Sequence, residues 1–220
     1  MLFLHGYLSS KEAFLYQIRY FSAFYRVTAI DFLGFGASEK LKNPFSVADY
    51  SLWLKETLKK LGVEKPHVLA HSFGCRVAVK TASKDNEIFD KIVLTGPAGI
   101  ILNRGFSYRL KVKTYRAVKR LFPKFAEKRF GSKEYRSLSP IMKESYKKIV
   151  NEDLREDAKK VVNPVLIIQG ADDKTTTEQE AKIYLDSFPN ATLIKTEGGH
   201  FAFVDNPVNF NLILEEFLYE

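Results

Sequence analysis

The sequence Ala-His-Ser-Phe-Gly at residues 70–74 stands between an apolar run at 67–70 and an amphipathic stretch at 73–84. A serine at a tight turn from a strand into a helix projects its hydroxyl above the edge of a sheet, and small residues on either side let the backbone pack closely. The N-terminus of the helix that follows favours a developing negative charge. A serine that only caps an ordinary strand-to-helix turn fits these five residues equally well, so the rest of the chain must decide.

Short apolar runs alternate with amphipathic stretches along most of the chain. The runs are rich in Val, Ile and Leu, which is typical of parallel strands buried on both faces. Strands are expected at 1–4, 26–30, 67–70, 91–95, 165–169 and 192–196, and helices at about 10–22, 46–61, 73–84, 177–187 and 207–218. Ser46 with Asp49, and Thr177 with Glu180, form capping-box patterns that start two of these helices. This alternation predicts an α/β protein with a parallel sheet and right-handed crossovers.

The alternation stops between residues 97 and 160, where no strand is expected. From 109 to 122 most apolar residues fall on one arc of a helix and most basic residues on the other, and Pro123 should end or kink that helix. We therefore interpret 97–160 as a helical lid inserted into a core made of 1–96 and 161–220.

The predicted lid is rich in aromatic residues, and Phe106, Tyr115 and Phe122 are candidates for contact with a substrate. An apolar lid face above Ser72 would make a water-poor pocket suited to an acyl or aryl group. The alternative, in which the rings only pack the lid onto the core, accounts for most of them.

Positive charge is concentrated in the same segment. Residues 104–150 hold 15 Lys and Arg against 3 Glu, in a chain whose net charge is +8. Nucleic-acid binding is one interpretation of such a block. A solvated face on a helical lid is the preferred one, because no helix-turn-helix, zinc finger or aromatic-basic RNA signature accompanies the block.

Composition narrows the class of protein further. The 220 residues are 45% hydrophobic and 27% charged, as in an ordinary globular domain with one sizeable core. The sequence has no run of 18 apolar residues, so no membrane span is predicted. The apolar start of the chain is too short for a secretory signal. The single cysteine excludes an internal disulfide, and the four histidines lack the spacing of a metal site. We expect a cytoplasmic protein without metal or cofactor.

Two polar loops follow strands near the end of the chain. Asp172 and Asp173 come after the run 165–169, and His200 comes after the run 192–196. A serine hydroxyl needs a base to become nucleophilic near pH 7, and the base needs a carboxylate to orient it. Because the carboxyl ends of parallel strands meet at one edge of a sheet, these loops are where partners for Ser72 are expected.

The chain resembles an α/β-hydrolase over nearly all of its length outside the predicted lid. Five segments match the family's motifs in its order: Leu4-His5-Gly6-Tyr7, Asp31-Phe32-Leu33-Gly34-Phe35-Gly36-Ala37-Ser38, Ala70-His71-Ser72-Phe73-Gly74, Gln169-Gly170 with Asp172-Asp173, and Gly199-His200. The family usually has glycine at the position of Ala70, and it places two further strands before the one at 1–4. The resemblance therefore implies about six strands here, in either a minimal version of the fold or a chain truncated at its start.

The resemblance also assigns roles to five residues. Ser72 is the expected nucleophile, His200 the base that takes its proton, and Asp173 the carboxylate that orients the imidazole. The backbone N–H groups of Tyr7 and Phe73 are expected to form the oxyanion hole. Asp173 is preferred over its neighbour at 172 because the family's acid stands three residues after the glycine.

Structural roles are expected for the remaining candidates. Cys75 is interpreted as a small packing residue and not as a nucleophile. Asp31 is expected to hold a turn, and His71 to pack or hydrogen-bond locally. Asp205 is expected to cap the last helix, which starts near Pro207.

The function that follows from these residues and the resemblance is a cofactor-free serine hydrolase. Its substrate is expected to be a small or medium carboxylic ester, cleaved through an acyl-enzyme on Ser72. Two alternatives stay open: a carbon–carbon bond hydrolase acting on vinylogous diketones with the same triad, and a non-catalytic ligand-binding member of the fold. Related epoxide hydrolases and haloalkane dehalogenases carry Asp at the position of Ser72, which disfavours those activities. A small molecule is the expected partner, with no nucleic acid and no integral membrane association.

Overall fold

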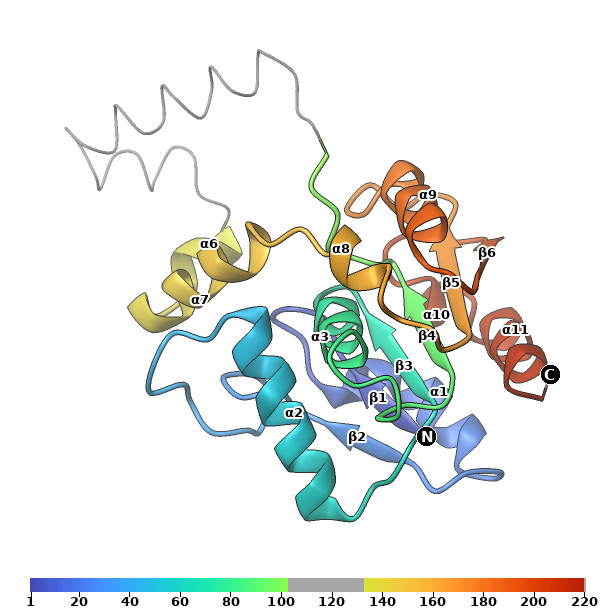
Figure 1. The fold of residues 1–220 in the computed structure, drawn as a ribbon, viewed down its shortest axis with the longest axis horizontal. Helices are drawn as coiled ribbons and strands as arrows, with labels where there is room; N and C mark the ends of the chain where they lie inside the picture. Colours follow the sequence, from blue (N-terminus) through green and yellow to red (C-terminus); the bar gives the residue numbers. More distant parts are fainter. Residues whose placement is uncertain (103–132, 220) are drawn as a thin grey trace.

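The computed structural model describes residues 1–102 and 133–219 and contains a parallel sheet of six strands in the order β2-β1-β3-β4-β5-β6 (Figure 1). The strands are β1 (Leu2–Leu4), β2 (Thr28–Ile30), β3 (Val68–His71), β4 (Ile92–Thr95), β5 (Val165–Gly170) and β6 (Ala191–Thr196). All six lie within a residue or two of the predicted strands, and the parallel α/β class is confirmed.

Helices cover both faces of the sheet (Figure 1). One face carries α2 (Val47–Leu61), α3 (Phe73–Ala82), α8 (Arg155–Ala158) and α9 (Glu178–Ser187). The other carries the 3-10 helix η1 (Lys11–Phe14), α1 (Leu15–Phe21), α10 (Ala202–Asp205) and α11 (Pro207–Tyr219). Alternate residues of each strand therefore enter two separate cores: Leu2 and Leu4 pack under α2 and α3, whereas Phe3 packs against Phe14 on the opposite side.

The order of strands reverses between β1 and β3. From β1 the chain crosses to β2 on one side, and from β3 onward each new strand is added on the other side. In open parallel sheets the crevice at such a switch point, beyond the carboxyl ends of the strands, is where ligands bind. The loops after β1 and β3, which contain Tyr7 and Ser72, meet there.

Both predicted capping boxes are present. The Ser46 backbone N–H donates to the Asp49 carboxylate at 2.7 Å at the start of α2, and the Thr177 N–H donates to the Glu180 carboxylate at 2.6 Å at the start of α9. Gly62 ends α2 in the left-handed region with φ of 60°. The predicted helix at 10–22 is present as two consecutive pieces, η1 and α1.

Three helices of the predicted lid segment 97–160 lie in the described part of the chain: α6 (Lys133–Ser137), α7 (Pro140–Val150) and α8. In Figure 1, α6 and α7 stand outside the helical layers, whereas α8 packs beside α3. The predicted helix at 109–122 and the aromatic candidates Phe106, Tyr115 and Phe122 lie outside the described residues. Among the described helices, none has the length and apolar character needed to cross a membrane.

A glycine on α3 allows this helix to contact the end of β1. A Cβ at Gly74 would lie 2.2 Å from the Leu4 carbonyl oxygen, an atom of the backbone that cannot rotate away. The same addition at Gly62 would meet no atom within 4 Å, although its φ of +60° disfavours a side chain.

We expect Gly74→Ala to lower the free energy of unfolding by about 3 kcal/mol, because α3 or β1 must shift to make room. Gly62→Ala serves as the matched control, with an expected loss of about 1 kcal/mol from backbone conformation alone. Urea denaturation of the three proteins measures the difference. Equal losses in the two variants would mean that the close approach at Gly74 does not constrain the fold.

Candidate active site

Ser72 occupies the sharp turn between β3 and α3. Its backbone has φ of 50° and ψ of −105°, a region that residues other than glycine rarely adopt. Such a conformation costs on the order of 1–3 kcal/mol and persists only when its surroundings hold it. Here the Ser72 N–H donates to the Thr95 carbonyl at 3.1 Å, and Gly74 lets the following helix pass over β1.

His200 and Asp173 are joined by a hydrogen bond of 2.8 Å from His200 Nδ1 to Asp173 Oδ2. Three more donors hold the carboxylate: the Thr175 N–H at 2.7 Å and the Thr176 N–H at 3.0 Å on Oδ1, and the Thr176 hydroxyl at 2.8 Å on Oδ2. The neighbouring Asp172 is exposed. Of the two aspartates in this loop, Asp173 is therefore the one placed to orient the imidazole.

The environment of Asp173 keeps its carboxylate ionised. Burial by itself would raise the pKa of Asp173, but the hydrogen bonds from His200 and from the backbone N–H groups of Thr176 and Thr175 outweigh it and bring the pKa to about 2. An ionised Asp173 accepts the Nδ1 proton of His200, which leaves Nε2 of the neutral ring free to accept a proton.

Gly96, the residue after β4, lies against this pair. A Cβ there would lie 3.0 Å from His200 Nδ1 and 3.2 Å from Asp173 Oδ2, and φ is +51°. A glycine at this position therefore leaves the space that the imidazole and the carboxylate occupy.

The backbone around His200 is held from two sides. His71 Nε2 donates to the His200 carbonyl at 2.9 Å, and burial lowers the pKa of His71 to about 3, so its ring stays neutral. Asp205 Oδ2 accepts the Gly199 N–H at 2.8 Å. The expectation that Asp205 caps the last helix is wrong: its carboxylate braces the turn before His200, and the side chain of Asn206 faces the start of α11 instead.

Ser72 and His200 line one cavity of about 390 Å³. Gly6, Tyr7 and Phe73 line it as well. Within the described part of the chain, no acceptor is bonded to the backbone N–H of Tyr7 or of Phe73. Both N–H groups are thus available to a ligand, and that of Phe73 is the first of helix α3.

Apolar and aromatic side chains from α6, α7 and the His200 loop complete the wall of this cavity: Tyr135, Leu138, Tyr146, Ile149, Val150 and Phe201. Tyr146 packs on Tyr7 with ring centroids 5.2 Å apart, and the Tyr7 hydroxyl donates to the Met142 carbonyl at 3.3 Å. The loop after β1 and helix α7 therefore form one continuous surface opposite Ser72.

The contacts of Cys75 and Asp31 fit the structural roles expected for them. Cys75 is fully buried, its thiol contacts the Ala70 carbonyl at 3.1 Å, and burial raises its pKa. Asp31 accepts the backbone N–H groups of Lys11 at 2.7 Å and Ala37 at 2.9 Å, as expected of a residue that holds a turn.

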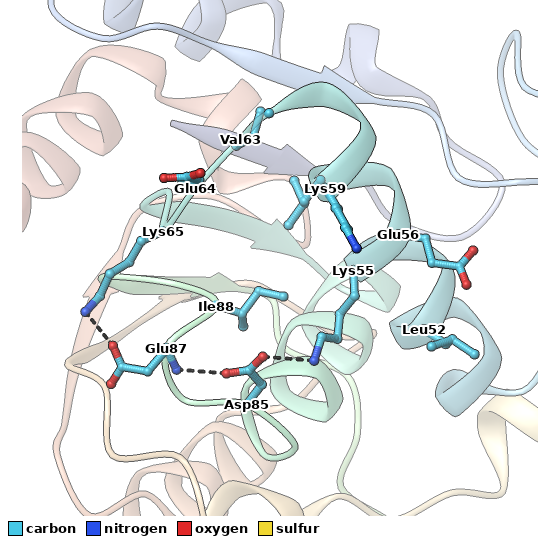
Figure 2. A pocket seen from close by; sticks show the side chains of 12 residues that line it. Leu52, Lys55, Glu56, Lys59, Val63, Glu64, Lys65, Asp85, Glu87 and Ile88 are labelled. Carbon is cyan, nitrogen blue, oxygen red and sulfur yellow. Dashed lines mark hydrogen bonds and ion pairs between the residues drawn. The ribbon is translucent and has the colours of Figure 1, made fainter.

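A second hollow, of about 570 Å³, lies beside the C-terminal half of α2 (Figure 2). It is also lined by the loop that leads into β4, so it is at the amino ends of the strands and away from Ser72. Four of its charged side chains form two ion pairs, Lys55 with Asp85 at 2.8 Å and Lys65 with Glu87 at 2.9 Å. Among the described residues, no serine, cysteine or histidine lines it.

A family model described as the alpha/beta hydrolase fold matches residues 1–142. This chain belongs to the alpha/beta hydrolase family. It is 26% identical over 221 residues to 2-hydroxymuconate semialdehyde hydrolase of Pseudomonas putida, a match that covers 89% of this chain and 77% of that protein. It is 33% identical to epoxide hydrolase 1 of Caenorhabditis elegans, over 42% of this chain but only 24% of that protein. The chain thus spans about a quarter of the length of some of the curated relatives it matches.

Solved structures of the family have the same fold at low sequence identity. An esterase from Exiguobacterium antarcticum superposes with a TM-score of 0.78 at 19% identity, covering 100% of this chain and 91% of the esterase. A meta-cleavage product hydrolase from Pseudomonas fluorescens superposes with a TM-score of 0.75 at 22% identity, covering 99% of this chain and 89% of that one.

Three residues that shape the site were not singled out from the sequence. Gly96 directly follows a predicted strand, but its closeness to His200 depends on the packing of β4 beside β5. Thr176 contacts Asp173 within one loop, three residues away. Arg76 carried no clear signal in the sequence, since a second basic residue, Lys80, stands one turn further along the same helix.

The depressed pKa of Asp173 predicts a specific dependence of stability on pH. A carboxyl whose folded pKa lies below its ordinary value of 3.8 stabilises the fold above that value, and this contribution is lost as pH falls toward about 2. We expect Asp173 to contribute about 2 kcal/mol to the loss of stability between pH 5.5 and pH 2.5. Denaturant unfolding at both pH values should show a smaller loss for Asp173→Asn than for the wild type.

The exposed neighbour provides the control for this measurement. Asp172→Asn should keep the pH dependence of the wild type, because its side chain is exposed. The assignment fails if Asp173→Asn and the wild type lose the same stability on acidification.

Proposed function

We propose that this chain is a serine hydrolase that cleaves a small or medium carboxylic ester through an acyl-enzyme on Ser72. The observation that carries the proposal is the 2.8 Å hydrogen bond between His200 and Asp173, with His200 and Ser72 on one cavity. An imidazole oriented by a buried carboxylate beside a serine in a strained turn is the arrangement that makes an alcohol nucleophilic.

The reaction would proceed in two acyl transfers. Ser72 Oγ attacks the ester carbonyl carbon while its proton passes to His200 Nε2, and the carbonyl oxygen becomes an anion between the N–H groups of Tyr7 and Phe73. The C–O bond of the ester then breaks, and the alcohol leaves with the proton from His200. A water molecule attacks the acyl-enzyme in the same way, which releases the acid and restores Ser72.

The cavity supports an ester of modest size. Its volume of about 390 Å³ lies at the lower end of the range for small-molecule sites, and its wall is mostly apolar and aromatic. Epoxide opening is disfavoured by Ser72 itself, because attack by a serine oxygen on an epoxide would leave an ether that water does not readily hydrolyse.

Carbon–carbon bond hydrolysis is a second candidate. The observation that favours it is the match to 2-hydroxymuconate semialdehyde hydrolase, which covers 89% of this chain. The same serine, base and oxyanion donors would serve both reactions, with a stabilised carbanion in place of an alkoxide as the leaving group.

We expect a fluorophosphonate probe to label the wild type on Ser72 and Ser72→Ala to lose all labelling, because the probe reacts with an activated serine hydroxyl. Ser22→Ala is the matched control: Ser22 is exposed, and its hydroxyl donates to the Ile18 carbonyl. Mass spectrometry of the labelled protein locates the adduct. An unlabelled wild type, with the protein folded, would favour the ligand-binding alternative.

A substrate panel distinguishes the two reactions. We expect 4-nitrophenyl esters of two to six acyl carbons to be hydrolysed, and Asp173→Asn to lower kcat by about 10⁴-fold because the imidazole loses its orienting partner. Vinylogous 1,5-diketones are assayed in parallel by loss of their chromophore. A higher kcat/KM for the diketones than for every ester would replace the esterase by the carbon–carbon bond hydrolase.

A further inference from the structure

Arg76 is a buried cation at the wall of the proposed active site. It lies in the first turn of α3, four residues after Ser72, which directly precedes the helix. Arg76 is only 7% exposed, yet it lines the cavity of Ser72 and His200 and also an adjoining cavity of about 660 Å³ that Ser72 lines as well.

The guanidinium group has donors without acceptors. Arg76 Nη1 donates to the carbonyl oxygens of Ile149 and Glu152, both at 2.8 Å. Across residues 1–102 and 133–219 no acceptor is bonded to Nε or Nη2, and no carboxylate lies within ion-pair distance of the group. Since an arginine carries five N–H hydrogens, three of them are left for a ligand in the cavity.

The nearest acidic side chains are already engaged. The Glu152 carboxylate pairs with a lysine ammonium at 2.8 Å, and Asp153 accepts a backbone N–H at 2.8 Å. Glu180 accepts the N–H that starts helix α9, at 2.6 Å. Within the described part of the chain, the direct partners of the buried Arg76 charge are thus carbonyl oxygens alone. An anion that enters the cavity would form a strong, charge-assisted hydrogen bond with this group.

We propose that Arg76 binds a carboxylate on the acyl part of the substrate, so that the preferred substrates are monoesters of short dicarboxylic acids. The proposal rests on the proposed function, because it places the scissile carbonyl at Ser72. Four residues of helix rise about 6 Å, which suits an acyl chain of a few carbons between two carboxyl groups, as in succinate or glutarate. The planar fork of a guanidinium matches a carboxylate with two parallel hydrogen bonds.

The test compares two esters with five acyl carbons, 4-nitrophenyl hydrogen glutarate, whose chain ends in a carboxylate, and 4-nitrophenyl pentanoate, whose chain ends in a methyl group. We expect the wild type to prefer the glutarate ester by at least tenfold in kcat/KM. Arg76→Gln should lower kcat/KM for the glutarate ester by about 10–100-fold and change that for the pentanoate ester by less than about threefold. Lys84→Gln, an exposed basic residue two turns further along the chain and outside both cavities, should keep the preference of the wild type.

A second variant keeps the test decisive if Arg76→Gln fails to fold after losing its bonds to the carbonyls of Ile149 and Glu152. Arg76→Lys retains the charge but not the fork, and it should lose most of the preference while still hydrolysing the neutral ester. No preference in the wild type, or an unchanged preference in the folded variants, would overturn the carboxylate site.

A binding measurement on a variant that cannot turn over substrate tests the carboxylate site independently of the proposed hydrolase activity. Calorimetric titration of glutarate into Ser72→Ala should show binding that the double variant Ser72→Ala with Arg76→Gln lacks. If the wild type hydrolyses no ester but glutarate still binds through Arg76, the proposed function fails and the carboxylate site stands. If esters are hydrolysed and glutarate binds both proteins equally or neither, the site fails and the proposed function stands.

Discussion

The hydrogen bond between His200 and Asp173 is the interaction on which the rest of the site depends. It joins the loop after β5 to the loop after β6, and both loops are built to hold it. The carboxylate receives two backbone N–H groups and one hydroxyl from Thr175 and Thr176, and Gly96 leaves room for the pair. Because these donors favour the ionised form of Asp173, the carboxylate is placed to accept a hydrogen bond from His200 Nδ1.

Close packing of α3 against β1 is the second constraint. Gly74 lets the helix start directly above the Leu4 carbonyl, and this start holds Ser72 in its strained turn. The same approach brings the N–H groups of Tyr7 and Phe73 to one cavity. Ser72, His200 and the N–H groups of Tyr7 and Phe73 are thus brought to one cavity by the ends of β1, β3 and β6, at the switch point of the sheet.

Helix α7 is tied to the core at both ends. Near its start the Met142 carbonyl accepts the Tyr7 hydroxyl, and at its end the Ile149 carbonyl accepts Arg76 Nη1. Both donors come from the walls of the cavity, so residues that line the cavity also hold helix α7 in place. Helix α7, held in this way, forms one wall of the cavity.

The strands, most of the helices and the loops of the candidate site can be predicted from the sequence. Apolar runs and capping patterns predict the six strands and most helices, because burial on both faces and the needs of helix ends leave local signatures. The turn at Ser72 and the loops with Asp173 and His200 are also recognisable, because each follows a buried strand.

Which of these residues meet depends on how the elements pack in three dimensions. Asp205 reads as a helix cap in sequence but braces the turn before His200, and Arg76 reads as one basic residue among many but lies buried beside Ser72. The physical reason is that hydrogen bonds and burial act across distances in space that local sequence does not encode. Hydrophobic periodicity in the sequence determines the helices and strands. The packing of those helices and strands determines which groups surround a charged side chain.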